Sequence, residues 1–211
     1  MARADPFFRS VSATSRDFSS VQCGVSYARL TLSACSEKPL PEDLTPGLPS
    51  KQQAGELIQH YWNRVFTIFP LFDERRFFES YKVVYNSGPS TATCHDHYFI
   101  RMALALSSAS HVRQPGDRYS MDAVGHVAVA LSFAEQVFHP GSIENIQALV
   151  LLVQYSLVDP IHFDSWALIG AAVRATVDLG LHQEPSKALR ISKEQLDLRR
   201  RVFYCVYSLD R

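Results

Sequence analysis

From Lys51 onward, the apolar residues of this chain recur at intervals of three and four, which places them along one face of an α-helix. The stretch from Lys51 to Phe69 shows this stripe clearly, and Pro70 ends it. Its apolar members are Leu57, Ile58, Tyr61, Trp62, Val65, Phe66 and Phe69. No segment alternates apolar and polar residues over a useful length, so the sequence predicts helices and no strands.

Capping residues indicate where the next helices begin. Asp73 can cap a helix, and another helix is expected from about residue 95 to residue 111. Asp117 or Ser120 opens a long helix that we expect to continue to Phe138. Each of these segments has its own apolar face and a polar break after it.

The last third of the chain predicts three more helices. Ser142 caps a strongly apolar segment, Ile143–Val158, and Gly180 is suited to the left-handed turn that ends the helix after it. Ser192 and Gln195 form a capping box for the final helix. Seven helices joined by short polar breaks predict an all-α fold, a multi-helix bundle or array.

Residues 1–50 have a different composition. Ser, Thr and Pro dominate there, and no apolar periodicity persists. Proline removes a backbone donor and disfavours helix at the residue before it. We therefore expect residues 1–50 to be a disordered arm and linker, and residues 51–211 to be the helical domain.

Composition argues against several function classes. The formal net charge is zero and the isoelectric point is about 7.1, so bulk charge gives no support for direct DNA binding. No run of 18 or more uninterrupted apolar residues is present, and no membrane span is predicted. Phosphate-binding loops, dinucleotide fingerprints and HExxH motifs are also missing, so no enzyme is predicted. The cysteines have no CxxC spacing, which favours free thiols over zinc or disulfides; they are Cys23, Cys35, Cys94 and Cys205.

One cluster carries metal-ligand chemistry: Cys94, His95, Asp96 and His97. Adjacent residues at a helix start point in different directions, so four donors in a row need not converge on one ion. The alternatives are a metal site and an ordinary polar helix entry.

The stretch from Ile146 to Arg211 contains an ordered set of residues that resembles a known family. A helix ends in an aromatic residue, a Trp–Gly–Arg helix leads into a Leu-Gly-Leu-His turn, and an arginine triplet precedes a terminal Asp-Arg pair. These residues are Gln147, Leu149, Leu152, Tyr155, Trp166, Gly170, Ala171, Arg174, Leu179, Gly180, Leu181, His182, Arg199, Arg200, Arg201, Phe203, Leu209, Asp210 and Arg211. Upstream, Tyr61, Phe69, Pro70 and Phe77 lie in register with the same pattern. The set resembles the fungal-specific transcription factor domain, the middle regulatory region of binuclear zinc-cluster, xylanolytic-activator-type factors.

The resemblance implies a function and a location. Such a domain controls DNA-templated transcription in the nucleus through protein partners of the transcription machinery, homo-oligomers or a small-molecule effector. The family binds DNA through an N-terminal cluster of cysteines that holds zinc. This chain has no such cluster, so no cofactor is expected in it and DNA contact is expected only through that missing element. The alternative is a stand-alone interaction protein that does not bind DNA.

The family's domain continues beyond the Asp-Arg pair with which this sequence ends. A domain truncated there leaves an apolar helix face uncovered, and we expect oligomerisation or poor solubility.

The motif residues suggest structural roles. Gly170 costs about 1 kcal/mol in a helix interior, and close helix packing beside Trp166 is the expected compensation. The arginines Arg174, Arg199, Arg200 and Arg201 either pair between helices, with Asp178, Asp197 and Asp210, and fix their register, or form a solvated basic face. His182 is expected to cap or pack at a helix end.

Overall fold

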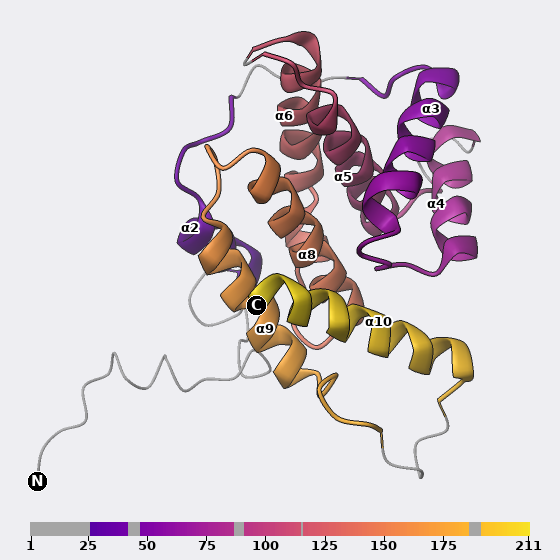
Figure 1. Ribbon diagram of the computed structural model, residues 1–211, viewed down its shortest axis with the longest axis vertical. Helices are drawn as coiled ribbons and strands as arrows, with labels where there is room; N and C mark the ends of the chain where they lie inside the picture. The colour runs from indigo at the N-terminus through magenta and orange to yellow at the C-terminus, as the bar shows by residue number, and fades with distance from the viewer. Residues whose placement is uncertain (1–25, 42–46, 87–90, 115, 186–190) are drawn as a thin grey trace, which may run out of the picture.

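The computed structural model describes residues 26–41, 47–86, 91–114, 116–185 and 191–211, and within these ranges the protein is built from helices (Figure 1). The first half contains α2 (Tyr27–Cys35), α3 (Lys51–Tyr61), the π-helical turn η2 (Trp62–Phe66), α4 (Glu74–Asn86) and α5 (Cys94–Ser110). The second half contains α6 (Arg118–Leu131), α7 (Ala134–Val137), α8 (Ile143–Val158), α9 (Ser165–Asp178) and α10 (Lys193–Asp210). The described ranges hold no strand, only an isolated bridge between Ser36 and Phe163. The all-α prediction is confirmed.

The centre of the fold is formed by α5 and α8. Both helices are buried on nearly all sides, from Tyr98 to Ala109 in α5 and from Asn145 to Ser156 in α8. Their segments are apolar around the whole helix, which is the pattern of a helix enclosed by others. The helices α3, α4 and α6 pack on α5, and α9 and α10 pack on α8.

The helix α10 crosses one end of the bundle (Figure 1). It packs against α8 and α9 and buries Val202, Cys205 and Val206. Its carboxyl end reaches the surface where α2 and α9 lie together. The last helix therefore connects the early and late parts of the domain.

The local signals for helix ends are confirmed. Asp117, Ser142 and Ser192 cap α6, α8 and α10, and Ser192 forms the expected capping box with Gln195. Gly180 has a φ of +68°, the left-handed conformation predicted for the end of α9.

The helix α2 lies inside the segment expected to be an arm. Ser26 caps it, and Ala28 and Cys35 are buried where it packs on α9 and α7. A helix of nine residues with two buried positions gives too short a periodic pattern to detect. The prediction of an unstructured arm is therefore wrong for Tyr27–Cys35, while residues 1–25 and 42–46 lie outside the described part.

Two expected helices are interrupted. The helix predicted from Asp117 to Phe138 ends at Leu131, because Phe133 leaves the helical conformation with φ −94° and ψ 2°. The break lets Phe133 stack on His97, with their ring centroids 5.2 Å apart. The stripe from residue 51 to residue 69 ends earlier as the π-helical turn η2, inside which Trp62 and Phe66 stack at 3.7 Å.

No helix in the described ranges is long and apolar enough to cross a lipid bilayer.

Candidate functional site

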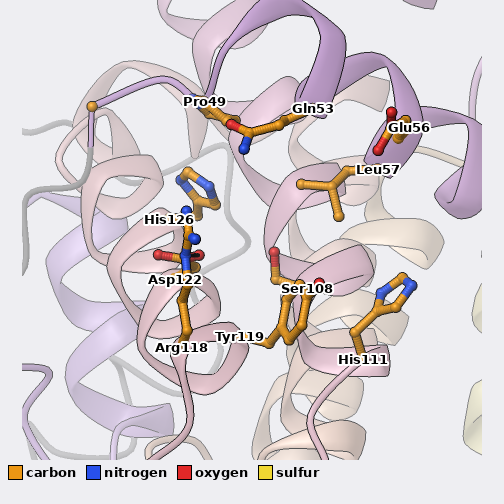
Figure 2. A pocket seen from close by; sticks show the side chains of 11 residues that line it. Pro49, Gln53, Glu56, Leu57, Ser108, His111, Arg118, Tyr119, Asp122 and His126 are labelled. Atoms are coloured by element: carbon orange, nitrogen blue, oxygen red, sulfur yellow. Dashed lines mark ion pairs between the residues drawn. The ribbon is translucent and has the colours of Figure 1, made fainter.

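A pocket of about 440 Å³ opens between α3, α5 and α6, and we call it the α6 pocket (Figure 2). In Figure 2, Arg118, Asp122 and His126 lie on the α6 side, and Ser108 of α5 and His111, directly after α5, lie opposite them. The lining residues are Gly47, Pro49, Gln53, Glu56, Leu57, Ser108, His111, Arg118, Tyr119, Asp122 and His126. Pockets of this volume are typical of small-ligand sites.

The floor of the α6 pocket contains the buried His126, which is paired with an arginine behind it, Arg101. His126 is 3% exposed, and its Nδ1 lies 2.9 Å from a terminal guanidinium nitrogen of Arg101. A guanidinium can only donate hydrogen bonds, so Nδ1 of His126 accepts this one and Nε2 carries the ring proton. Burial, and then the charge of Arg101, lower the pKa of His126 to about 4. The imidazole is therefore neutral at physiological pH and has an Nε2–H donor.

Arg101 also connects the floor to the segment before α3. The nitrogen that donates to His126 lies 3.2 Å from the carbonyl oxygen of Gly47. Burial lowers the pKa of this guanidinium, which is 8% exposed as a residue. A cation thus lies directly behind the neutral imidazole.

Two aromatic rings, His111 and Tyr119, form one wall of the pocket, and His60 packs on His111 without lining it. His60 and His111 have centroids 4.3 Å apart, and His111 stacks on Tyr119 at 5.4 Å with an interplanar angle of 29°. Burial, and then the neighbouring His111 and Arg64, lower the pKa of His60. Tyr119 is 45% exposed, so part of this side chain remains accessible in the pocket.

The rim carries charge of both signs. Glu56 and Asp122 are carboxylates, and Arg118 lies one helical turn before Asp122 with a 3.6 Å contact between its Nε and the carboxylate. The sequence alone does not reveal this site, because its residues come from segments separated by tens of positions. The available signal was a lone Arg and a lone His, Arg101 and His126, inside otherwise apolar helices.

A second hollow of about 860 Å³ lies between α2, α9 and the end of α10, and we call it the α9 groove. It brings together seven of the motif residues: Trp166, Gly170, Ala171, Arg174, Leu209, Asp210 and Arg211. Trp166 is 84% exposed, which is unusual for so large an apolar side chain. Arg211 lies over the ring of Tyr207, with its guanidinium carbon 5.3 Å from the ring centroid.

The expected role of Gly170 is wrong. A Cβ at this position would meet only the guanidinium of Arg174, at 3.6 Å, and no neighbouring helix. The glycine therefore does not permit close helix packing beside Trp166.

The arginine triplet fixes contacts between elements, mostly through backbone carbonyls. Arg199 donates to the carbonyl of Gly180 at 3.2 Å. Arg200 pairs with Glu184 at 2.9 Å, and both side chains are exposed. Arg201 donates to the carbonyl oxygens of Pro70 and Phe72 at 3.1 and 2.7 Å and pairs with Asp197. Arg199 and Arg201 thus hold α10 to other segments through backbone carbonyls and not through the inter-helix carboxylate pairs named in the register interpretation, and Arg200 lies on a solvated face.

The Leu-Gly-Leu-His turn packs through Leu181, which is 6% exposed. His182 is exposed, so the expected packing role does not apply to it.

The segment Cys94–His97 is a polar helix entry. Thr93 and Asp96 form a capping box, and Ser80 donates a hydrogen bond to the Asp96 carboxylate at 2.5 Å. These hydrogen bonds together lower the pKa of Asp96 although burial opposes them. Across the part of the chain that the structure describes, no group of three or more His, Cys, Asp or Glu residues is arranged to hold a metal ion.

The chain is similar to one known protein family and to several individual proteins. The family model of the fungal specific transcription factor domain matches residues 58–211. The sorbicillinoid biosynthetic cluster transcription factor 2 of Penicillium rubens is 27% identical over 171 residues, which cover 78% of this chain and 25% of the relative. The positive regulator of purine utilization of Emericella nidulans is 23% identical in an alignment of length 219, gaps included. The alignment covers 77% of this chain and 21% of the relative.

The pyrimidine pathway regulatory protein 1 of Saccharomyces cerevisiae is 31% identical over 123 residues, covering 54% of this chain and 12% of that protein. The chain thus spans a quarter or less of the length of these three relatives. No solved structure matches it.

Proposed function

The chain belongs to the fungal-specific transcription factor domain family, and from this membership we propose that it controls transcription through contacts with other proteins and through a small effector. Its relatives are transcription regulators, which favours this function over a stand-alone interaction protein. A role as a regulatory domain also agrees with a sequence that has none of the common catalytic motifs.

The α9 groove carries the proposal for protein contacts. Family-motif residues that are far apart in the sequence, Trp166 on α9 and Arg211 after α10, line the same surface hollow. An exposed tryptophan beside arginines is the composition typical of the residues that dominate protein interfaces. The partners are proteins of the transcription machinery or a second copy of the chain.

DNA binding and location follow from the family in the same proposal. The net charge of zero does not favour phosphate contacts by this domain itself. We expect DNA to be bound by a zinc cluster elsewhere in the parent protein, which acts in the nucleus. The described residues of this chain would take no part in holding that zinc.

A tethered reporter assay tests the proposal. The chain is fused to an unrelated DNA-binding domain in yeast, and reporter output is compared with that of the DNA-binding domain alone. We expect the fusion to change the output and Trp166→Ala to remove most of that change. Because the side chain is 84% exposed, the variant should melt at the same temperature as the parent chain.

Tyr204→Ala is the matched control, since Tyr204 is 62% exposed on α10 and does not line the groove. A fusion without effect on the reporter, or equal effects of the two substitutions, would contradict the proposed role of the groove.

A further inference from the structure

The α6 pocket has the depth and construction of a ligand site. Its floor is made by Ser108 and His126, which are 1% and 3% exposed, and its rim by exposed residues of α3 and α6. Three helices and the segment at Gly47 contribute, so the cavity is formed by tertiary packing and not by one loop (Figure 2).

The floor has a preference for one kind of ligand atom. Arg101 donates a hydrogen bond to Nδ1 of His126, so the other ring nitrogen, Nε2, carries the proton and is the donor that a ligand can meet. An N–H donor favours a hydrogen-bond acceptor, such as a carbonyl oxygen, and disfavours an ammonium group, which can only donate. Arg101 itself does not line the pocket; it donates to Gly47 and His126 behind the floor.

The rim does not favour anions. Two carboxylates, Glu56 and Asp122, face a single guanidinium, that of Arg118, and this guanidinium is already close to Asp122. An incoming carboxylate would lose hydration without meeting a net positive field.

The wall favours a flat molecule. Tyr119 presents a partly exposed ring that is oriented by stacking on His111. Leu57 and Pro49 add apolar surface to the cavity. Aromatic rings gain from offset stacking on such a face in addition to the area they bury.

We infer that the α6 pocket binds a small, planar, uncharged molecule with a hydrogen-bond acceptor directed at His126. The site is a candidate for the effector site of the domain, and in that regulatory sense the inference rests on the function proposed above. The binding chemistry itself depends only on the pocket.

Three probes of the same size separate the ligand classes: benzamide, benzoate and benzylamine. Binding to the full chain is followed by the ¹⁵N and ¹H signals of its histidine imidazoles at neutral pH. Benzamide should bind with a dissociation constant of the order of a millimolar, as expected for a small fragment, and shift the His126 signals. Benzoate and benzylamine should bind about tenfold more weakly or not at all, since one is charged at the acceptor and the other has no acceptor.

Variants of α6 check the location. Tyr119→Ala should weaken benzamide binding about tenfold through lost stacking. Met121→Ala is the matched control, because Met121 is 50% exposed on the same helix and does not line the pocket, and it should leave binding unchanged.

Equal or tighter binding of benzoate or benzylamine would overturn the inference, as would undetectable benzamide binding or unmoved His126 signals. The reporter assay keeps the two proposals apart. A Trp166-dependent reporter together with no benzamide binding removes only the ligand inference. Benzamide binding together with a silent fusion removes only the regulatory proposal.

Discussion

The three consecutive arginines of α10 have different surroundings, although they are adjacent in the sequence. The side chain of Arg201 is 26% exposed, and it donates to two carbonyl oxygens of the loop between η2 and α4. Arg200 is more than half exposed and meets only the exposed Glu184. Hydrogen bonds from a charged donor to half-buried carbonyls are worth far more than a solvated ion pair.

We therefore expect Arg201→Ala to lower the free energy of unfolding by about 2 kcal/mol. Arg200→Ala should leave it nearly unchanged and serves as the control. Urea unfolding followed by circular dichroism measures both values. Equal losses for the two variants would show that the carbonyl contacts of Arg201 do not stabilise the fold.

One of the two interpretations drawn from the sequence had the arginines fix contacts between helices, with carboxylates as their partners. Backbone carbonyls cannot be recognised as partners from side-chain patterns, because every residue has one. The α6 pocket escaped prediction for a related reason. Its residues form no motif in the sequence, and they line one cavity only when α3, α5 and α6 pack together.

At the scale of the elements, the ends of helices were predicted better than their interruptions. Caps such as Ser142 and Ser192 act on residues within one turn, so the sequence alone is enough to find them. The break after Leu131 depends on what Phe133 meets, namely His97 of α5. A contact between distant segments decides that break, and periodicity does not report it.

The helix α9 contains one glycine inside and is followed by another, and the two should respond oppositely to substitution. Gly170→Ala should stabilise the protein by about 0.5–1 kcal/mol, since an added Cβ meets only the flexible Arg174 side chain at ordinary distance. Gly180→Ala should destabilise it by about 1 kcal/mol, because φ is +68° there.

Thermal unfolding of the two variants, followed by far-ultraviolet circular dichroism, shows whether each substitution raises or lowers the stability of the protein. If both substitutions destabilised the protein, Gly170 would have a packing role that the structure does not show. If both stabilised it, the turn at Gly180 would tolerate a side chain.

At the scale of the whole molecule, the buried His126 makes stability depend on pH. Its pKa is about 4 in the folded protein and near 6.5 in the unfolded chain, so the unfolded state binds more protons between these values. Stability should therefore fall as pH drops from about 6.5 to about 4, by about 3 kcal/mol from this group.

Burial also lowers the pKa of His60 and His97, so the stability that these two groups contribute also falls as the pH drops. Urea unfolding at a series of pH values measures the total. His126→Phe should flatten the curve in this window, and an unchanged slope in that variant would assign the acid sensitivity to the other histidines.

Large apolar side chains remain exposed on the outer helices of the fold. They include Trp166 and Val177 of α9 and Tyr204 and Tyr207 of α10. Self-association through such surfaces stays a prediction, and light scattering over a range of concentrations measures it.

The contacts of Arg201 also have a consequence for how the chain is synthesised. The arginine lies 131 and 129 residues after the carbonyls of Pro70 and Phe72 that it binds. A ribosome must therefore add at least 129 residues after Phe72 before this contact can form. Until then the loop beside α4 has two carbonyls without their native donor, so the early helices should remain open to chaperones until Arg201 has left the ribosome.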